Sequence, residues 1–474
     1  MNRLPLLRAT ELRALEARYV DAAPPLMERA GRAAAELALR LLENRRARVL
    51  VLAGPGNNGG DAIVMAHVLK QQGIDVVVGP GGTVPKGDYG LVVDGLFGIG
   101  LGRPISGAYA DLIERINDFR GPVLALDIPS GLDGDTGRVM GVAVRATHTI
   151  SFIGGKPGLY TLDGPDHCGE VSVVDLGLRL DKFPGALLAV DDFRDCLKPR
   201  RRNSHKGSYG SLAVIGGAAG MTGAALLAGR AGLQLGAGRV FVGLLQVLAV
   251  DPLQPELMLR TADNALDQAT AAVVGPGLGT SDVALEIVRR CLPAERNPRH
   301  AERTSADFSL LLDADALNLL AAHPVLAAHL LRRTASTIIT PHPAEAARLL
   351  ATTTEAVQAD RVGAALKLAQ RFKAHVALKG CGTVIAHPDG RWRINASGNP
   401  GLASGGTGDV LSGFIGALLA QGWPADAALS GAVHLHGAAA DALAANGTGP
   451  VGIAAGELIP VARTLLNRLI ATNA

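Results

Sequence analysis

Residues 399–413 read Asn-Pro-Gly-Leu-Ala-Ser-Gly-Gly-Thr-Gly-Asp-Val-Leu-Ser-Gly, a cluster of glycines that leads into Asp409 and then into an apolar run. The apolar run, residues 410–419, predicts a helix. Glycines leave backbone N–H groups uncovered and a helix N-terminus adds partial positive charge, so the stretch predicts an anion site suited to phosphate. We expect Asp409 to act there as a base on a hydroxyl group that is about to receive a phosphoryl group. The alternative is a glycine-rich loop in which Asp409 only caps the helix.

The overall composition narrows the class of protein. A chain of 474 residues is long enough for two or three domains, each with its own core. The 60 glycines and the aromatic content of 3% suit compact α/β layers with many tight turns. A net charge of +3, without a long basic run, argues against nucleic acid as a partner.

Signals for location are few. The four cysteines, Cys168, Cys196, Cys291 and Cys381, are scattered without the spacing of a metal site. Apolar runs are broken before they reach the length of a membrane span, and Arg and Glu mixed near the start predict that there is no signal peptide. We therefore expect a reducing, cytoplasmic location and no membrane partner.

The N-terminal part of the chain alternates between helix and strand patterns. Residues 10–44 predict a helix, and 48–53 predict a short buried strand that runs into a glycine turn at 54–61. A helix at 63–70 and a strand at 75–78 follow. This order is that of a βαβ unit, so we expect a mostly parallel sheet that binds ligands outside the carboxyl ends of its strands.

Three loops of this part follow predicted strands and carry polar residues. The residues are Asn57, Asn58 and Asp61 after the first strand, Asp94 at the end of strand 91–94, and Asp127 and Ser130 after strand 123–127. The first loop has neither the GxGxxG spacing nor the lysine of a nucleotide fingerprint. The side chains offer hard oxygen atoms, which suit potassium or another oxygen-binding ion beside a ligand. The alternative is that they cap helices and turns.

The composition restarts near residue 200, where we place a domain boundary. Further strands are predicted at 210–215, 239–243, 271–274, 310–312, 337–339 and 375–378, again as a parallel α/β layer. Lys379 follows the last of these and precedes glycines, so it either meets a phosphate or lies on a hairpin surface. His342, between two prolines, either bonds a ligand or caps the helix that begins near Glu345. Residues 293–307 predict an exposed loop.

Several of these motifs resemble one known family. Gly56-Asn-Asn-Gly-Gly-Asp61, Gly95 to Pro104 and Asp127-Ile-Pro-Ser-Gly-Leu-Asp133 resemble the epimerase half of bifunctional NAD(P)H-hydrate repair enzymes. Lys206-Gly-Ser-Tyr-Gly210, Thr340-Pro-His-Pro-Ala-Glu345 and 399–409 resemble the dehydratase half. The resemblance covers nearly the whole chain. It implies an α/β protein of two domains, a Rossmann-like three-layer epimerase domain at 1–200 and a ribokinase-like dehydratase domain at 201–474.

The resemblance also implies two activities on NADH or NADPH that carries water across its nicotinamide ring. The first half would interconvert the R and S epimers of the hydrate. The second would use ADP to phosphorylate the ring hydroxyl of the S form, after which phosphate leaves and NAD(P)H and AMP remain. Potassium, magnesium and ADP are the implied cofactors and co-substrate, and a homo-oligomer is the implied assembly.

Site residues follow from the resemblance position by position. In the first half, the hydrate would contact Asn57, Asn58, Gly59, Gly60, Asp61, Gly98, Ile99, Gly100, Leu101, Gly102, Arg103, Pro104 and the catalytic Asp127, and potassium would be held by Asn58, Asp94 and Ser130. In the second half, the hydrate would contact Ala224, Gly277, His342 and the catalytic base Asp409, and the nucleotide would contact Lys379, Gly380, Cys381, Gly382, Thr383 and Gly408. The Gly405–Gly408 amides would stabilise the transferred phosphoryl charge.

Two departures and one rival remain. Ala62 stands where the family often has Gly, and Cys381 where it more often has Ala. The rival is a small-molecule kinase of ribokinase-like fold, for a vitamin precursor or a sugar, fused to a ligand-binding domain, because the Gly-Thr-Gly-Asp run serves such kinases equally well. The fusion to the Asn-Asn-Gly-Gly-Asp loop favours the repair enzyme.

Overall fold

The computed structural model describes residues 3–42, 47–80, 87–180, 183–292 and 308–473, and the predicted loop at 293–307 lies outside them. The chain divides into two compact units at residues 187 and 188. The predicted boundary near 200 lies farther along, and residues 188–200 pack on the second unit. Phe193 and Leu197 are each 2% exposed in its core, and the Leu188 N–H donates to the Ile394 carbonyl over 2.8 Å.

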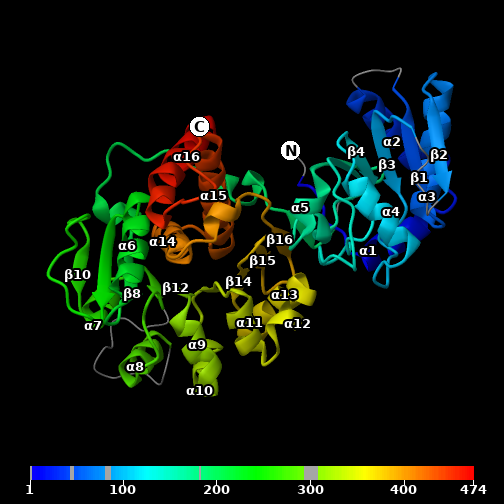
Figure 1. The fold of residues 1–474 in the computed structure, drawn as a ribbon. Coiled ribbons are helices and arrows are strands. Elements are labelled where there is room, and N and C mark those ends of the chain that lie inside the picture. The colour runs from blue at the N-terminus through cyan, green and yellow to red at the C-terminus, as the bar shows by residue number, and fades with distance from the viewer. Residues whose placement is uncertain (1–2, 43–46, 81–86, 181–182, 293–307, 474) are drawn as a thin grey trace. The chain divides into compact units, whose positions relative to one another are not determined.

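The first unit is a parallel sheet with helices on both faces (Figure 1). Its elements are α1 (Ala9–Glu16), the 3-10 turn η1 (Ala17–Tyr19), α2 (Leu26–Leu41), β1 (Val49–Ala53), α3 (Asn57–Gln71), β2 (Val76–Pro80), β3 (Leu91–Gly95), α4 (Ala108–Asn117), β4 (Val123–Leu126), β5 (His148–Phe152), η2 (Pro157–Leu159), α5 (Gly164–Cys168), β6 (Glu170–Val174) and β7 (Gly185–Leu187). The strand order is β2-β1-β3-β4-β5-β6, with every neighbouring pair parallel. All six carboxyl ends therefore meet at one edge, as predicted.

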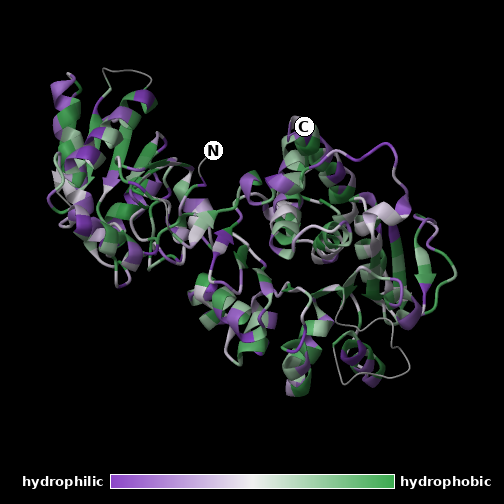
Figure 2. Ribbon diagram, turned by 180° about the vertical axis from the view of Figure 1, so that it is seen from behind, coloured by the Kyte–Doolittle hydropathy of each residue, from purple (hydrophilic) through white to green (hydrophobic). Residues whose placement is uncertain are grey.

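The alternation of side chains along β1 explains the layers of this unit. Val49 and Val51 join the buried cluster formed with α2 and α3, whereas Leu50 and Leu52 join the cluster that contains α4. Successive residues of a strand point to opposite faces, so an unbroken apolar strand needs cover on both sides. Figure 2 shows the strands largely in the colour of hydrophobic residues.

The predicted helix at 10–44 is wrong as a single element. α1 ends at Glu16, and α2 begins only after Pro24 and Pro25, because proline removes a backbone N–H and disfavours helix in the residue before it. Within α2, Ala30, Ala34 and Leu37 are buried, whereas Met27 is 37% exposed.

The second unit is a larger α/β layer. Its elements are the turns η3 (Val190–Asp192), η4 (Arg194–Cys196) and η5 (Lys206–Tyr209), then β8 (Ser211–Gly216), α6 (Thr222–Gln234), β9 (Arg239–Leu244), β10 (Met258–Arg260), α7 (Ala262–Leu266), β11 (Ala271–Val274), α8 (Asp282–Cys291), β12 (Ser309–Leu312), α9 (Asp315–Ala322), α10 (Pro324–Leu330), β13 (Thr337–Ile339), α11 (Pro343–Leu350), α12 (Thr354–Ala359), α13 (Arg361–Phe372), β14 (His375–Leu378), β15 (Val384–Ala386), β16 (Trp392–Ile394), η7 (Pro400–Leu402), α14 (Thr407–Ala420), α15 (Ala425–Ala445), η8 (Ala455–Glu457) and α16 (Leu458–Asn473).

The strands of this unit follow the order β10-β9-β8-β11-β12-β13-β14-β15-β16. The pairs from β10 to β14 are parallel, but β15 and β16 are antiparallel, which corrects the expectation of a wholly parallel layer. The reason is the length of the 379–383 connection, since parallel strands need a crossover of about a dozen residues. α6 and α14–α16 cover one face, and α8–α13 lie on the other (Figure 1).

Helix α14 lies at the centre of this unit, and all its residues except Gly408 and Asp409 are buried. It packs on α6 so closely that a Cβ added at Gly413 would come within 2.2 Å of the Ala228 carbonyl oxygen. The small residues of α6 thus allow this close packing. Among the described helices, none is long and apolar enough to cross a membrane.

Candidate active sites

Asp94 and Ser130 form a buried polar pair at the carboxyl edge of the first sheet. Asp94 lies near the end of β3, and Ser130 follows β4; both are fully buried. The Ser130 backbone N–H donates to Asp94 Oδ2 over 2.8 Å, and the Ser130 hydroxyl donates to Asp94 Oδ1 over 2.6 Å. Burial raises the pKa of Asp94 to about 6, although the hydrogen bonds from Ser130 oppose that rise.

Asn58 reaches the same place from the first turn of α3. It is 6% exposed, and neither its Oδ1 nor its Nδ2 has a hydrogen-bond partner within the described residues. A Cβ added at Gly98 would lie 3.4 Å from Asn58 Cβ and 3.8 Å from Asp127 Oδ2, so the three predicted loops do converge. A buried amide without a partner is costly unless a ligand completes it. The oxygen donors of Asn58, Asp94 and Ser130 therefore fit a potassium ion.

Asp127 directly follows β4 and has a left-handed backbone, with φ of 62°. That conformation is uncommon for a residue other than glycine and is often associated with a functional constraint. The Nζ atom of Lys156, which is fully buried, donates to Asp127 Oδ1 and also to the Phe152 carbonyl over 2.9 Å. The sequence analysis missed Lys156. Its position in Gly-Gly-Lys-Pro just after β5 was the signal that could have found it.

A cluster of carboxyl groups surrounds Asp127. Burial, the Asp127 charge and then Glu16 raise the pKa of Asp61 to about 8, with Lys156 opposing. Burial and Asp127 also raise the pKa of Glu16, which ends α1 and was not predicted as a site residue. The arrangement places a neutral acid beside a lysine-paired carboxylate, which is how enzymes separate acid and base roles.

The predicted turn at 54–61 is wrong from Asn57 onward, because these residues form the first turn of α3; its glycines and those of the second loop have different surroundings. A Cβ at Gly59 would meet the Gly54 carbonyl oxygen at 1.9 Å, and one at Gly60 would meet the Met27 sulfur at 2.7 Å, so close packing explains both. Gly98 faces the site, whereas Gly102 has open space beside it. The remaining predicted contacts of this stretch are half-buried or exposed: Asn57, Ile99, Gly100, Leu101, Arg103 and Pro104.

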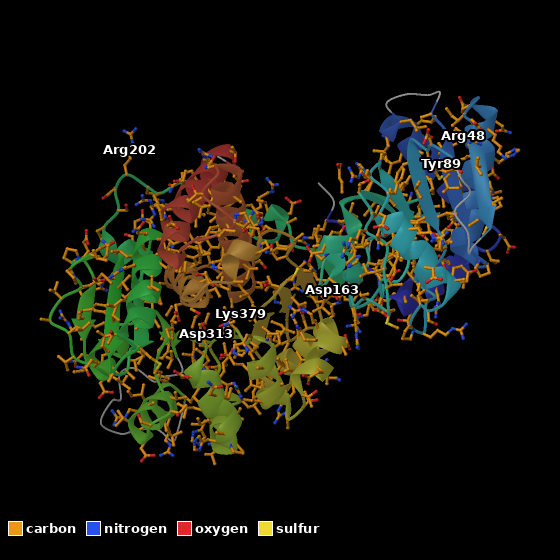
Figure 3. The ribbon with its side chains drawn as sticks, in the orientation of Figure 1. Arg48, Tyr89, Asp163, Arg202, Asp313 and Lys379 are labelled. Carbon is orange, nitrogen blue, oxygen red and sulfur yellow. The ribbon has the colours of Figure 1, made fainter. Side chains whose placement is uncertain are left out.

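In the second unit, Lys379 and Asp313 lie beside each other (Figure 3). Lys379 Nζ donates to Asp313 Oδ1 over 2.7 Å, and the Ser412 hydroxyl of α14 donates to Asp313 Oδ2 over 2.7 Å. A Cβ added at Gly408 would lie 3.7 Å from Lys379 Nζ, so the lysine and the glycine run meet. Lys379 does lie in a hairpin, between the antiparallel strands β14 and β15, but its side chain is only 21% exposed and is paired with Asp313, so its contact with a phosphate stays a prediction.

Asp409 lies in the first turn of α14, next to this ion pair. Burial and the neighbouring Asp313 raise its pKa to about 6, and Lys379 opposes that rise. Burial lowers the pKa of Lys379 itself, but the carboxylates of Asp313 and Glu345 outweigh that effect and the net change is upward. The alternative in which Asp409 only caps the helix is wrong. The N-cap residue of α14 is Gly406, and no side chain forms a capping hydrogen bond there.

His342 does cap a helix. Its Nδ1 accepts hydrogen bonds from the Ala344 and Glu345 N–H groups over 3.1 and 3.4 Å, and Glu345 Oε2 accepts from the His342 N–H over 2.8 Å. Burial lowers the pKa of His342, with Lys379 adding to the effect, which favours a neutral ring. Elsewhere at this edge, Gly277 has φ of 58°, and a Cβ added there would lie 3.2 Å from Ala224 Cβ, so these two predicted contacts are neighbours.

Three side chains that were not predicted as site residues form hydrogen bonds to the backbone of residues 398–407. We call residues 405–408 the glycine run. The Thr407 hydroxyl oxygen lies 2.9 Å from the carbonyl oxygens of both Leu402 and Ser404, and its one proton is shared between them. His436 Nε2 lies 2.9 Å from the Thr407 carbonyl, and Asp441 accepts from the Gly398 N–H over 2.7 Å. A cavity of about 320 Å³ adjoins the run, lined by Pro400, Gly401, Ala403, Ser404, Pro450, Val451, Gly452 and Ile453.

Two carboxylates of this site, those of Asp313 and Glu345, lie next to the Lys379 ammonium. Asp313 and Glu345 each have an oxygen within 4.0 Å of Lys379 Nζ. Within the described residues there is no cluster of three or more metal-binding side chains. Magnesium usually takes one or two carboxylates and completes its shell with phosphates and water, so Asp313 and Glu345 are the candidates to hold it together with a nucleotide.

Each of the two units matches a known protein family. Residues 212–460 match the family model described as NAD(P)H-hydrate dehydratase, and residues 24–86 and 80–158 match the model described as YjeF-related protein N-terminus. The chain is 37% identical to the bifunctional NAD(P)H-hydrate repair enzyme Nnr of Coxiella burnetii, over 93% of this chain and 94% of that protein. The Nnr enzyme of Escherichia coli is 38% identical over 93% of this chain and 89% of its own length.

Among solved structures, an ADP/ATP-dependent NAD(P)H-hydrate dehydratase from Bacillus subtilis, co-crystallised with ATP and Mg²⁺, is 31% identical, with a TM-score of 0.51. The match covers 60% of this chain and 98% of that one, so it supports the ribokinase-like fold. A ribokinase-like protein from Enterococcus faecalis matches similarly, with 27% identity and a TM-score of 0.52 over 62% of this chain and 99% of its own. With relatives this similar over nearly its full length, the chain belongs to the family of bifunctional NAD(P)H-hydrate repair enzymes.

Proposed function

We propose that the second unit removes water from hydrated NADH and NADPH with ADP as the phosphoryl donor, and that the first unit interconverts the R and S hydrates. The observation that carries the dehydratase assignment is the environment of Asp409. It is a half-buried carboxylate beside Gly408 and Lys379, and its pKa is raised to about 6. Such a group stays ionised at neutral pH but is a stronger base than an ordinary aspartate.

The dehydration then follows in two steps. Asp409 accepts the proton of the ring hydroxyl while that oxygen attacks the terminal phosphorus of ADP, and the P–O bond to AMP breaks. The new phosphate ester leaves as inorganic phosphate, a ring proton is lost, and the double bond of NAD(P)H returns. Phosphoryl transfer depends mainly on positioning and charge stabilisation, which this site offers.

The other residues of the second unit position the nucleotide. The Gly405–Gly408 amides and the N-terminus of α14 face the transferred phosphoryl group, and Lys379 supplies a compact positive charge. The 379–383 loop contacts the nucleotide, and the cavity beside Ser404 has room for its base. Magnesium, held by Asp313 and Glu345, would neutralise phosphate charge. Ala224, Gly277 and His342 line the place of the hydrate.

In the first unit, the two epimers differ at the carbon that bears the hydroxyl, so a bond at that carbon must break and form again. Asp61, which is protonated at neutral pH, can donate a proton to the departing oxygen. Asp127, held by Lys156, can accept one. Asn58, Asp94 and Ser130 would hold potassium, which would supply positive charge next to these carboxylates.

The test is incubation of the protein with a mixture of both hydrate epimers and either ADP or ATP. We expect the absorbance of the reduced nicotinamide to return for the whole mixture, with one phosphate released per ring and AMP formed from ADP. A stable phosphorylated product without return of absorbance would instead identify the small-molecule kinase. The homo-oligomer and the cytoplasmic location stay predictions; light scattering and cell fractionation test them.

A further inference from the structure

Arg361, the first residue of α13, is a buried cation that bonds to the 379–383 loop. Its side chain is 3% exposed, and its Nη2 atom lies 3.2 Å from the Leu378 carbonyl oxygen, 3.2 Å from that of Lys379 and 3.4 Å from that of Gly382. Nη1 donates to Gln358 Oε1 over 2.7 Å. The guanidinium group therefore contacts carbonyl groups at both ends of this short loop.

These contacts also decide which way the loop amides point. In a trans peptide the C=O and the following N–H lie on opposite sides. Because the carbonyls of Lys379 and Gly382 face Arg361, the N–H groups of Gly380 and Thr383 face away from it. In the part of the chain that the structure describes, neither N–H donates to another protein group. The loop therefore presents free donors on the side opposite the arginine, which suits an anion.

Two glycines leave the backbone of this loop free to adopt other conformations, so neighbouring groups must hold its shape. Gly380 and Gly382 have φ of 135° and 64°, and a Cβ added at Gly380 would approach both Nη atoms of Arg361 at 3.0 Å. Burial lowers the pKa of Arg361 to about 10, so the side chain stays charged at neutral pH. Its positive charge stabilises carbonyl dipoles that would otherwise be free to turn toward the nucleotide.

We propose that Arg361 is a positioning residue for the nucleotide: it holds the 379–383 loop with its amides turned toward the phosphates of ADP. This inference rests on the proposed dehydratase function. Arg361 would act through the loop without contacting the nucleotide itself. Part of the affinity for ADP would therefore depend on a residue of α13.

The experiment compares Arg361→Met with Arg361→Lys and with wild type. We expect Arg361→Met to raise the Kd for ADP, measured by calorimetry, and the KM for ADP by about tenfold, which corresponds to about 1.4 kcal/mol. The kcat should change by less than about threefold, because Asp409 and the glycine run are untouched. Arg361→Lys, which keeps the charge and some donors, should recover part of the affinity.

Arg333→Met is the matched control. Arg333 is also a buried arginine whose pKa burial lowers to about 10, and it also donates to carbonyls, those of Cys291 and Phe308. These carbonyls lie at the end of α8 and the start of β12, away from the 379–383 loop. It should lose a similar amount of stability while the KM for ADP stays unchanged.

Equal ADP affinity in wild type and Arg361→Met, or an equal loss in Arg333→Met, would overturn the inference. If Arg361→Met does not fold, Gln358→Ala tests the inference instead. This variant removes the hydrogen-bond partner of Arg361 Nη1, so it should raise the KM for ADP at least about twofold. An unchanged KM would overturn the inference. Wild-type protein that binds no ADP would instead overturn the proposed function, so the two failures are distinguishable.

Discussion

Asp409 is the residue whose replacement tests the base assignment most directly. Asp409→Asn keeps the size of the side chain but cannot accept the hydroxyl proton, so we expect phosphate release to fall at least about 100-fold while ADP still binds. Phosphate release and ADP calorimetry measure the two effects. Asp282→Asn is the control, because Asp282 also lies in the first turn of a helix but is exposed. Retained turnover in Asp409→Asn would show that another group is the base.

The raised pKa of Asp61 predicts a pH dependence in the first unit. Its pKa rises from 3.8 in an ordinary environment to about 8 in the folded protein. Between these values the folded protein holds a proton that the unfolded chain releases, so its contribution to stability falls as pH rises and is lost above about 8. Epimerase activity should also fall above about pH 8, where the proton donor ionises.

Urea unfolding at several pH values, with Asp61→Asn and Asp111→Asn, measures this contribution. Asp61→Asn should show a smaller loss of stability between about pH 5 and about pH 9 than wild type, because an amide does not titrate. Asp111 is exposed on α4, so Asp111→Asn should follow wild type. Identical curves for all three proteins would contradict a proton on Asp61.

Asn58 predicts an ion dependence at the same site. Its amide is buried without a protein partner within the described residues, so a bound potassium ion would satisfy it. We expect epimerase activity to be higher in potassium chloride than in sodium chloride at equal ionic strength, and Asn58→Leu to abolish the difference. Dehydratase activity in the same two salts is the internal control. An equal effect of the salts on both activities would count against the ion site.

At the scale of elements, long apolar strands between glycine turns were predictable. β11, β13 and β14 begin and end where the sequence indicated, because a strand covered on both faces is continuously apolar. β10 and β16 were missed because Arg260 and Arg393 interrupt their short apolar runs, and β15 was missed because it directly follows the glycine-rich 379–383 loop. Lys156 was missed for a different reason: it meets Asp127 only because β5 pairs with β4.

The hydrogen bonds at the start of α14 can be tested separately from the catalytic group Asp409. The Thr407 hydroxyl shares its proton between the carbonyls of Leu402 and Ser404, which come just before Gly405, and so holds the backbone that leads into the helix. Thr407→Val removes the hydroxyl at similar size, so we expect about 1–3 kcal/mol less stability and a kcat about tenfold lower, because the amides lose their fixed direction. Thr407→Ser, which keeps the hydroxyl, should stay near wild type. Steady-state kinetics and urea unfolding measure both quantities.

At the scale of the whole molecule, two α/β units could be predicted because the composition restarts between them, but the point of division could not. The sequence of 188–200 is polar and contains proline, which indicates a connector, and yet Phe193 and Leu197 in it are buried in the second core. Only tertiary contacts show this: the Asn473 amide of α16 donates to the carbonyls of Arg194 and Leu197 over 3.2 and 3.0 Å.

A protein spanning residues 188–474 should therefore be more stable than one spanning 201–474. Loss of a buried Phe or Leu side chain typically costs about 2–5 kcal/mol, so removing both should lower the free energy of unfolding by roughly 5 kcal/mol or more. Urea unfolding measures the difference, and Phe193→Ala in the longer protein should reproduce part of it. The longer protein should also dehydrate the S hydrate alone and leave the R hydrate unrepaired. Equal stability of the two proteins would mean that residues 188–200 do not belong to the second core.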